Sequence, residues 1–169
     1  MKTRRFSGPP KGPVPCCLAL GKFDGFHQGH RKIVTVLRGC ASGGAVPAVF
    51  TFRTFPVEFY LCAWKERLSL LRGAGVELCL WADFDEVRNW EARKFLDRLD
   101  LFCEIRGVVV GKDFRFGRNR KGTVAHLAAW ARERGAETIV VEPVKKEGRV
   151  ISSSAVRTMV KQGKFSHAA

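Results

Sequence analysis

The sequence lacks the features of membrane proteins, secreted proteins and proteins that bind zinc through paired cysteines. No apolar run among its 169 residues approaches the length that crosses a membrane, and the basic, proline-rich and glycine-rich start has no apolar core of a signal peptide. The six cysteines include no Cys-x-x-Cys pair and have no partnering histidine cluster. We therefore interpret the cysteines as buried free thiols and expect a cytoplasmic protein without a membrane partner.

Acidic residues are scarce relative to basic ones. The chain holds 30 Lys and Arg against 16 Asp and Glu, which gives a formal charge of +14. Such a surface attracts polyanions, and both small phosphate ligands and nucleic acid fit this description, as does a solubility role. The length and the hydrophobic share of 46% indicate one domain with a sizeable core, and no internal repeat is present.

The chain is organised around residues 21–30, GKFDGFHQGH. The apolar residues 16–20 before this stretch are typical of a buried strand. After it, apolar residues recur at helical spacing, at Ile33, Val34, Val36 and Leu37. The stretch is therefore predicted to be a strand-to-helix turn, where the free N–H groups of a helix start favour an anion.

Two histidines, His27 and His30, stand three residues apart, so both imidazoles can reach one ligand. Phosphate suits them best, because Gly25 and Gly29 remove side chains where a phosphate chain would approach the backbone. A turn with two solvated or capping histidines is the plainer interpretation. A zinc site is a third, with Asp24 as the only further ligand nearby.

The pattern GxFDGxHxGH resembles the signature of the nucleotidylyltransferases with an HxGH motif, as carried by the FMN adenylyltransferase module of bacterial FAD synthetases. Residues 50–56, 109–117 and 151–157 match that family in the same order. The family usually has Pro-His-Pro where this chain has Thr54, Phe55 and Pro56, so no role of that histidine is carried over. The resemblance implies a nucleotidylyltransferase domain over residues 14–169. The basic residues and prolines before it predict a flexible segment over residues 1–13. Bacterial FAD synthetases usually carry a riboflavin kinase module after this domain, and from the length of the chain we expect no such domain here.

Strand and helix patterns alternate along this domain. Strands are predicted near residues 16–20, 45–52, 76–81, 107–110 and 137–141. Helices are predicted over 65–72, 90–101 and 123–134, the last capped by Thr123, and from a cap at Ser153 or Ser154 towards Gln162. This order predicts a single doubly wound, Rossmann-like α/β domain with about five parallel strands and a site at their carboxyl ends.

The resemblance implies that ATP and FMN react to give FAD and pyrophosphate, with Mg²⁺ accompanying ATP. It assigns catalysis to His27, His30 and Arg157. The residues that it assigns to ATP binding lie in the turn and at the start of the last helix: Gly21, Phe23, Asp24, Gly25, Gly29, Ser153 and Ser154. Flavin binding falls to the loop after the fourth strand: Asp113, Phe114, Arg115, Phe116 and Gly117.

Several alternatives remain open from the residues alone. Asp24 can orient the turn rather than lie near the nucleotide, and Phe114 and Phe116 can pack into the core. The basic, aromatic loop could bind single-stranded nucleic acid, although we expect only weak binding. Other functions are a transferase with another phosphate acceptor, or a degenerate, non-catalytic domain that binds nucleotides or nucleic acid.

Overall fold

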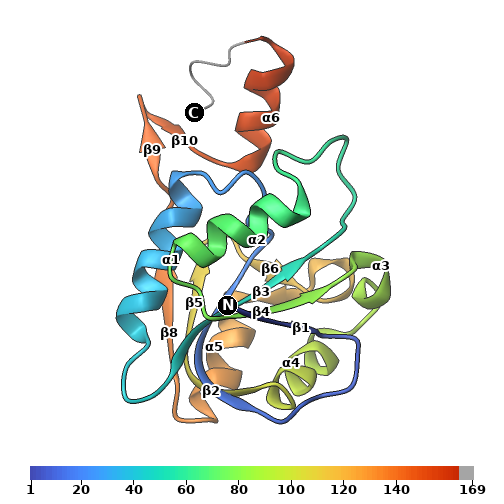
Figure 1. Cartoon of the computed structure of the whole chain (residues 1–169), viewed down its shortest axis with the longest axis vertical. Helices are drawn as coiled ribbons and strands as arrows, with labels where there is room; N and C mark the ends of the chain where they lie inside the picture. Colours follow the sequence, from blue (N-terminus) through green and yellow to red (C-terminus); the bar gives the residue numbers. More distant parts are fainter. Residues whose placement is uncertain (164–169) are drawn as a thin grey trace.

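The computed structural model describes residues 1–163, so the end of the expected domain 14–169 lies outside the described residues. Six parallel strands form one sheet in the order β1-β4-β3-β2-β5-β8 (Figure 1). They are β1 (Lys2–Arg5), β2 (Val14–Leu20), β3 (Val46–Phe52), β4 (Leu78–Ala82), β5 (Cys103–Gly111) and β8 (Glu137–Val141). The predicted doubly wound α/β fold is confirmed.

Helices cover both faces of the sheet. Alternate residues of β2 serve the two faces, because Cys16 and Leu18 belong to one apolar cluster and Cys17 and Ala19 to the other. Helices α4 (Ala92–Asp100) and α5 (Val124–Arg132) pack on the first cluster, and α1 (Gln28–Cys40) and α2 (Trp64–Gly73) on the second. Burial on both faces explains why the strands read as continuous apolar runs.

The smaller elements connect these layers. A short helix, α3 (Phe84–Val87), follows β4. Strands β6 (Arg115–Phe116) and β7 (Gly122–Thr123) form a hairpin around the 3₁₀ turn η1 (Arg118–Arg120). A second hairpin, β9 (Lys145–Lys146) and β10 (Arg149–Val150), leads to α6 (Ser153–Lys161). Within residues 1–163, no helix has the length and apolar character needed to span a bilayer.

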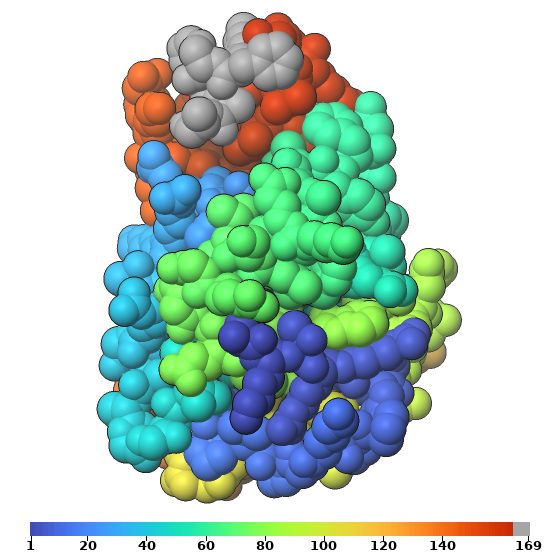
Figure 2. Space-filling view, in the orientation of Figure 1, coloured from blue at the N-terminus to red at the C-terminus, as the bar shows by residue number. Residues whose placement is uncertain are grey.

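The expectation of a flexible segment over residues 1–13 is wrong for its first part. Residues 2–5 form β1, which pairs with β4 at the sheet edge, and Phe6 is fully buried. The Phe6 ring packs edge-on against Phe50, with the ring centroids 4.9 Å apart. The prolines that discourage regular structure begin only at Pro9, so the preceding residues are free to extend. In Figure 2 this dark blue segment lies against the green of the neighbouring strand region.

The sheet order places a crevice at the carboxyl end of β2. From β2 the chain moves to β3 on one side, and β5 pairs with β2 on the other side. Ligands of open α/β sheets bind at such a reversal of strand order. The turn after β2 and the loop after β5 both emerge here, and α6 lies across this end of the molecule (Figure 1).

Candidate functional site

The backbone of the turn after β2 is strained in a way that only specific residues allow. Phe23 and Phe26 have left-handed φ angles of 50° and 38°, and burial of both rings holds them there. Gly25 has φ of 78°, and a Cβ at this position would lie 2.8 Å from Cδ1 of Leu61. Glycine is therefore required at this position. The turn delivers His27 to the N-cap of α1.

The two histidine rings face each other, as their spacing predicted. Their centroids are 3.7 Å apart with 21° between the planes, and each Nδ1 is buried without a hydrogen-bond partner among residues 1–163. Burial lowers the pKa of both imidazoles. It lowers the pKa of His30 to about 3, with further contributions from the charges of His27 and Arg67. Both rings are therefore neutral near pH 7, and each carries one N–H group. Of the two residues, His27 lines the first cavity described below.

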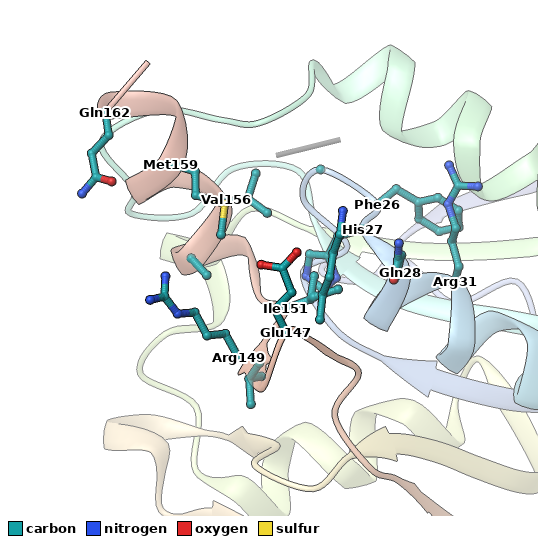
Figure 3. A pocket seen from close by; sticks show the side chains of 14 residues that line it. Phe26, His27, Gln28, Arg31, Glu147, Arg149, Ile151, Val156, Met159 and Gln162 are labelled. Atoms are coloured by element: carbon teal, nitrogen blue, oxygen red, sulfur yellow. The ribbon is translucent and has the colours of Figure 1, made fainter. Parts of the chain in front are cut away.

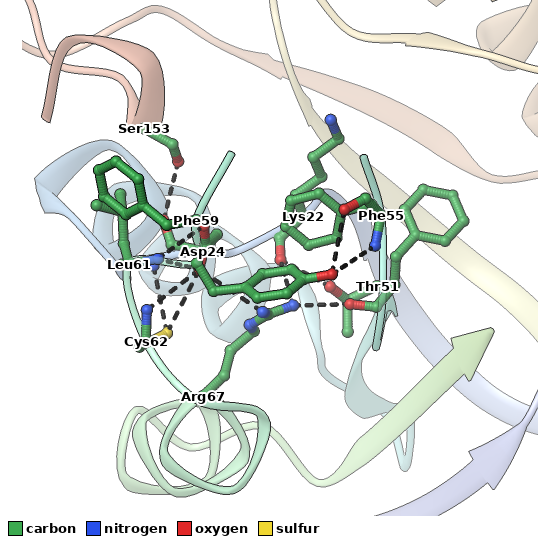
Figure 4. A network of polar contacts seen from close by, with 12 residues as sticks. Lys22, Asp24, Thr51, Phe55, Phe59, Leu61, Cys62, Arg67 and Ser153 are labelled. Atoms are coloured by element: carbon green, nitrogen blue, oxygen red, sulfur yellow. Dashed lines mark hydrogen bonds and ion pairs between the residues drawn. The ribbon is translucent and has the colours of Figure 1, made fainter. Parts of the chain in front are cut away.

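Asp24 holds the turn in place from within the protein (Figure 4). Its side chain is fully buried and accepts hydrogen bonds from the N–H groups of Leu61 at 3.1 Å and Cys62 at 3.3 Å. The carboxylate also pairs with Arg157 of α6 and lies 3.6 Å from the guanidinium of Arg67. A carboxylate enclosed in this way supports the interpretation that Asp24 orients the turn.

Arg67 is the buried cation of this network. Its side chain is 1% exposed and donates to the carbonyl oxygen of Phe52 at 2.7 Å. The guanidinium lies between 5 and 6 Å from the ring centroids of Phe55, Tyr60 and Trp64. No motif in the sequence points to Arg67, because it lies on an ordinary helix and no spacing rule connects it to Asp24.

Helix α6 is fastened to the turn by the same network. Arg157 donates to the carbonyl oxygen of Phe59 at 3.0 Å in addition to its pair with Asp24. Ser153 Oγ donates to the carbonyl oxygen of Asp24 at 2.9 Å. The predicted cap at Ser153 or Ser154 is wrong, because the Ser152 hydroxyl accepts from the Ala155 N–H and leaves Ser153 free to bind the turn.

One cavity of about 870 Å³ lies between the start of α1 and the C-terminal elements (Figure 3). His27, Gln28 and Arg31 line one side, as Figure 3 shows. The opposite side comes from the β9–β10 hairpin and α6, through Lys146, Glu147, Arg149, Ile151, Val156 and Met159. This first cavity combines cations and neutral N–H donors with an apolar wall, which suits a nucleotide with its phosphates. Sequence reasoning missed its cations because they stand outside the recognised motifs.

A second cavity, of about 650 Å³, opens on the other side of the turn. Gly21 and Lys22 of the turn line it, together with the residues predicted to bind flavin: Asp113, Phe114, Arg115, Phe116 and Gly117. The rings of Phe114 and Phe116 are stacked with centroids 5.7 Å apart. Phe116 is 7% exposed and belongs to the apolar core. It therefore packs in the core and lines the cavity at the same time.

The predicted ATP-binding residues do not lie together, since some line a cavity, some are buried and one is exposed. Gly25 lines the first cavity, and a Cβ on Gly29 would lie 3.1 Å from the His27 ring. Phe23 and Asp24 are buried, while Ser154 is exposed at the start of α6. At the end of the loop over residues 111–122, Thr123 caps α5 as predicted, and His126 completes that capping box.

The donors available for a metal are few. Within residues 1–163, no group of three or more His, Cys, Asp or Glu side chains is placed to hold a metal ion. The carboxylate of Asp24, which the zinc interpretation requires, is enclosed by Arg157, Arg67 and backbone N–H groups. The histidine pair is therefore not part of a metal centre built from the described residues.

Comparison with known proteins identifies similar chains. The family model described as FAD synthetase matches residues 10–155. The bifunctional riboflavin kinase/FMN adenylyltransferase of Escherichia coli K12 is 31% identical over 153 residues, which cover 84% of this chain and 49% of that protein. The Bacillus subtilis protein of the same name is 27% identical over 157 residues, covering 86% of this chain and 49% of that protein.

A solved structure, titled as a macrolide-efflux protein from Streptococcus pneumoniae, has a similar fold. The TM-score is 0.80 at 24% identity, and the match covers 98% of this chain and 58% of that one. This likeness shows the fold alone. The chain spans about half the length of the Escherichia coli and Bacillus subtilis relatives.

Proposed function

The chain belongs to the FAD synthetase family, and from that membership we propose that it transfers the adenylyl group of ATP to FMN, which gives FAD and pyrophosphate. The names of the Escherichia coli and Bacillus subtilis relatives include FMN adenylyltransferase, which supports this assignment. A nucleotidyltransferase of this kind needs two substrate sites that meet at one phosphorus atom.

The observation that carries the proposal is that one turn lines two cavities. Gly21 and Lys22 border the aromatic cavity, and Gly25 to Gln28 border the cavity next to α6. We assign the aromatic cavity to the flavin, because stacked Phe114 and Phe116 suit a planar ring system. The cavity beside α6 is assigned to ATP. The reacting phosphates then meet at the turn itself.

The reaction requires positioning and charge stabilisation. A phosphate oxygen of FMN attacks the α-phosphorus of ATP, and the bond from that phosphorus to the bridging oxygen of pyrophosphate breaks as the new bond forms. The neutral rings of His27 and His30 donate N–H groups to the oxygens on which charge develops. The Nδ1 atom of each ring is buried and has no hydrogen-bond partner among the described residues.

The leaving pyrophosphate is assigned to the C-terminal side of the first cavity. Arg31 and Arg149 line that cavity, and we retain Ser153, Ser154 and Arg157 as candidate ligands. Arg157 has a second role here, because its pair with Asp24 fastens α6 to the turn. Direct contact with pyrophosphate would require its guanidinium to exchange Asp24 or Phe59 for a phosphate oxygen.

Mg²⁺ would supply charge neutralisation on the phosphates of ATP. The described residues offer no group of carboxylates for it, since Asp24 is occupied by Arg157 and Arg67. The phosphate oxygens and water would therefore hold the ion, and no step above depends on a protein-bound metal. The six free cysteines are compatible with our proposal that the protein works in the cytoplasm.

The test is to incubate the purified chain with ATP, Mg²⁺ and FMN and to separate the products by chromatography. We expect FAD and pyrophosphate in equal amounts. Nicotinamide mononucleotide in place of FMN tests for another phosphate acceptor and should give no adduct. Absence of FAD at saturating substrates from a folded sample would refute the proposal, as would faster adenylylation of the alternative acceptor.

A further inference from the structure

Lys22 presents an unpaired ammonium group to the second cavity. Its side chain is exposed on the cavity wall and forms no ion pair within residues 1–163. The ammonium lies 4.9 Å from the ring centroid of Phe55. In Figure 4 the amino group points away from the network around Asp24, so that network does not use its charge.

The backbone of Lys22 is held firmly, although its ammonium is free. Its carbonyl oxygen accepts hydrogen bonds from Thr51 Oγ1 at 2.8 Å and from Arg67 at 3.4 Å. The next residue, Phe23, is fully buried in its left-handed conformation. A cation on a fixed backbone needs little reorganisation to bind a ligand.

A second free cation faces the same cavity from the loop after β5. Arg120 lines the cavity, and no ion pair engages it within the described residues. Its φ of 57° follows that of Asn119 at 54°, so two residues other than glycine in succession adopt the left-handed conformation. Such strain is frequent where a loop presents a side chain to a ligand.

These cations are close enough to affect each other. Partial burial at the cavity wall lowers the pKa of Lys22, and the positive charges of Arg157 and Arg120 lower it further, against a smaller opposing effect of Asp24. Cations gathered without an anion between them favour the binding of one.

The other groups around the cavity fit a ligand with an apolar ring and an anionic end. Its floor is aromatic, with Phe50, Phe52, Phe84, Phe95, Phe114 and Phe116. The remaining charged groups are Arg88, Arg115 and one carboxylate, Asp113, and Arg88 is already paired with Asp85. Lys22 of the turn and Arg120 of the loop thus both line this cavity without an ion-pair partner among the described residues.

We propose that Lys22, assisted by Arg120, binds the phosphate of the flavin substrate and thereby makes this site select FMN over riboflavin. This inference rests on the proposed function. Lys22 belongs to the turn that carries the histidines, so a phosphate held by it would lie at the side of the second cavity that this turn lines. Lys22 is therefore both a specificity residue and a positioning residue for the nucleophile.

The experiment compares FMN with riboflavin, which lacks the phosphate. Flavin fluorescence gives the two dissociation constants for the wild type, Lys22→Met and Lys22→Arg. The loss of a charge-assisted bond should weaken FMN binding roughly tenfold to a hundredfold in Lys22→Met. Riboflavin binding should change less than about twofold, and Lys22→Arg should recover most of the FMN affinity because it keeps the charge.

Lys94→Met is the matched control. Lys94 also places its ammonium over an aromatic ring, 5.0 Å from the centroid of Trp90, but it is exposed on α4 and does not line the cavity. This variant should bind both flavins like the wild type. In steady-state assays, Lys22→Met should raise the KM for FMN in proportion to its dissociation constant and leave the KM for ATP unchanged.

The outcomes separate this inference from the proposed function. Equal weakening of FMN and riboflavin in Lys22→Met would mean that Lys22 only supports the cavity, and would overturn the inference. FAD synthesis by the wild type together with unchanged FMN affinity in Lys22→Met would also overturn it and leave the proposed function standing. A folded wild type that makes no FAD and binds neither flavin would overturn both.

Discussion

The histidine turn over residues 21–30 and the basic loop over residues 111–122 leave the sheet from neighbouring strands but are stabilised in opposite ways. The turn is buried at Phe23, Asp24 and Phe26, and it is bonded to segments far away in the sequence, through Leu61, Cys62, Ser153 and Arg157. The loop is mostly exposed and closes on itself through the β6–β7 pair. It is anchored mainly at Gly117 and Arg118, which pack against the start of α4.

The difference separates two requirements of a group-transfer site. Groups that stabilise a transition state must be held in position before the reaction, and the turn meets this requirement through its buried ion pairs. Groups that bind a substrate need only to be within reach, and exposed cations, Lys22 of the turn and Arg120 of the loop, meet this second requirement. Changes at the buried residues of the turn should therefore affect folding and chemistry together, whereas changes at these exposed cations should affect binding alone.

The largest expected difference in stability is between two variants that each replace one aspartate by asparagine, one in the turn and one in the loop. Asp24→Asn keeps the shape of the side chain but leaves Arg67 buried without its counter-charge, which should lower the free energy of unfolding by about 3–5 kcal/mol. Asp113→Asn removes an exposed carboxylate of the loop and should change that free energy by less than about 0.5 kcal/mol. Urea unfolding measures both, and similar values for the two variants would invalidate the contrast.

A second comparison concerns the histidines. His27→Ala removes an N–H donor from the proposed transfer site and should lower kcat roughly a hundredfold to a thousandfold, as expected for loss of one donor to a developing charge. His126→Ala alters an exposed histidine at the end of the loop, where the side chain only completes a helix cap. That control should keep kcat within about twofold. Stopped assays for FAD test both variants, and unchanged turnover in His27→Ala would remove His27 from catalysis.

Arg157→Lys tests whether Arg157, which stabilises the turn, also takes part in catalysis. Lysine cannot bind Asp24 and the Phe59 carbonyl with one planar group, so stability should fall by about 1–2 kcal/mol. If Arg157 also contacts pyrophosphate, kcat/KM for ATP should fall roughly tenfold to a hundredfold at temperatures where the variant is fully folded.

The control for Arg157→Lys is Arg118→Lys, at an exposed pair with Glu91 in the loop, and it should change neither quantity appreciably. The thermal midpoint and kcat/KM of each variant are compared. Loss of stability without loss of kcat/KM would restrict Arg157 to its structural role.

Much of the fold could be predicted from the sequence because it depends on periodic apolar patterns. The helix predicted over 65–72 is α2 (Trp64–Gly73), and all five predicted strands are present. Strand β1 was missed because it is a short, charged edge strand. The only buried apolar residue near it in the sequence is Phe6, which directly follows the strand. Edge strands carry little of the apolar pattern on which such predictions rest.

The support of the site was less predictable than its motifs. The turn and the loop over residues 111–122 were located from their glycines and their position after buried strands. Pairing of Asp24 with Arg67 and Arg157 depends on how α2 and α6 pack, and no local spacing encodes it. The cap at Ser152 was missed because three successive serines offer equivalent hydroxyls, and only the contact between Ser153 and the turn distinguishes them.

The smallest expected effect is a pH dependence of stability that originates in the turn. Burial lowers the pKa of His30 to about 3, below its ordinary value of 6.5. Below pH 6.5 the unfolded chain takes up a proton that the folded protein does not, so stability falls as the pH decreases from 6.5 towards 3. At pH 5 this contribution is at most about 2 kcal/mol, at roughly 1.4 kcal/mol per pH unit.

His30→Gln should remove that contribution, although its own midpoint at pH 7 will be lower because a buried ring is lost. The informative quantity is therefore the difference in thermal midpoint between pH 7 and pH 5, which should be smaller in His30→Gln than in the wild type by a few degrees. His126→Gln, at the exposed position near the loop, should show the same difference as the wild type. If His30→Gln loses as much stability on acidification as the wild type, the acid sensitivity originates outside the turn, and the contrast between a buried, titration-sensitive turn and a solvated loop does not hold.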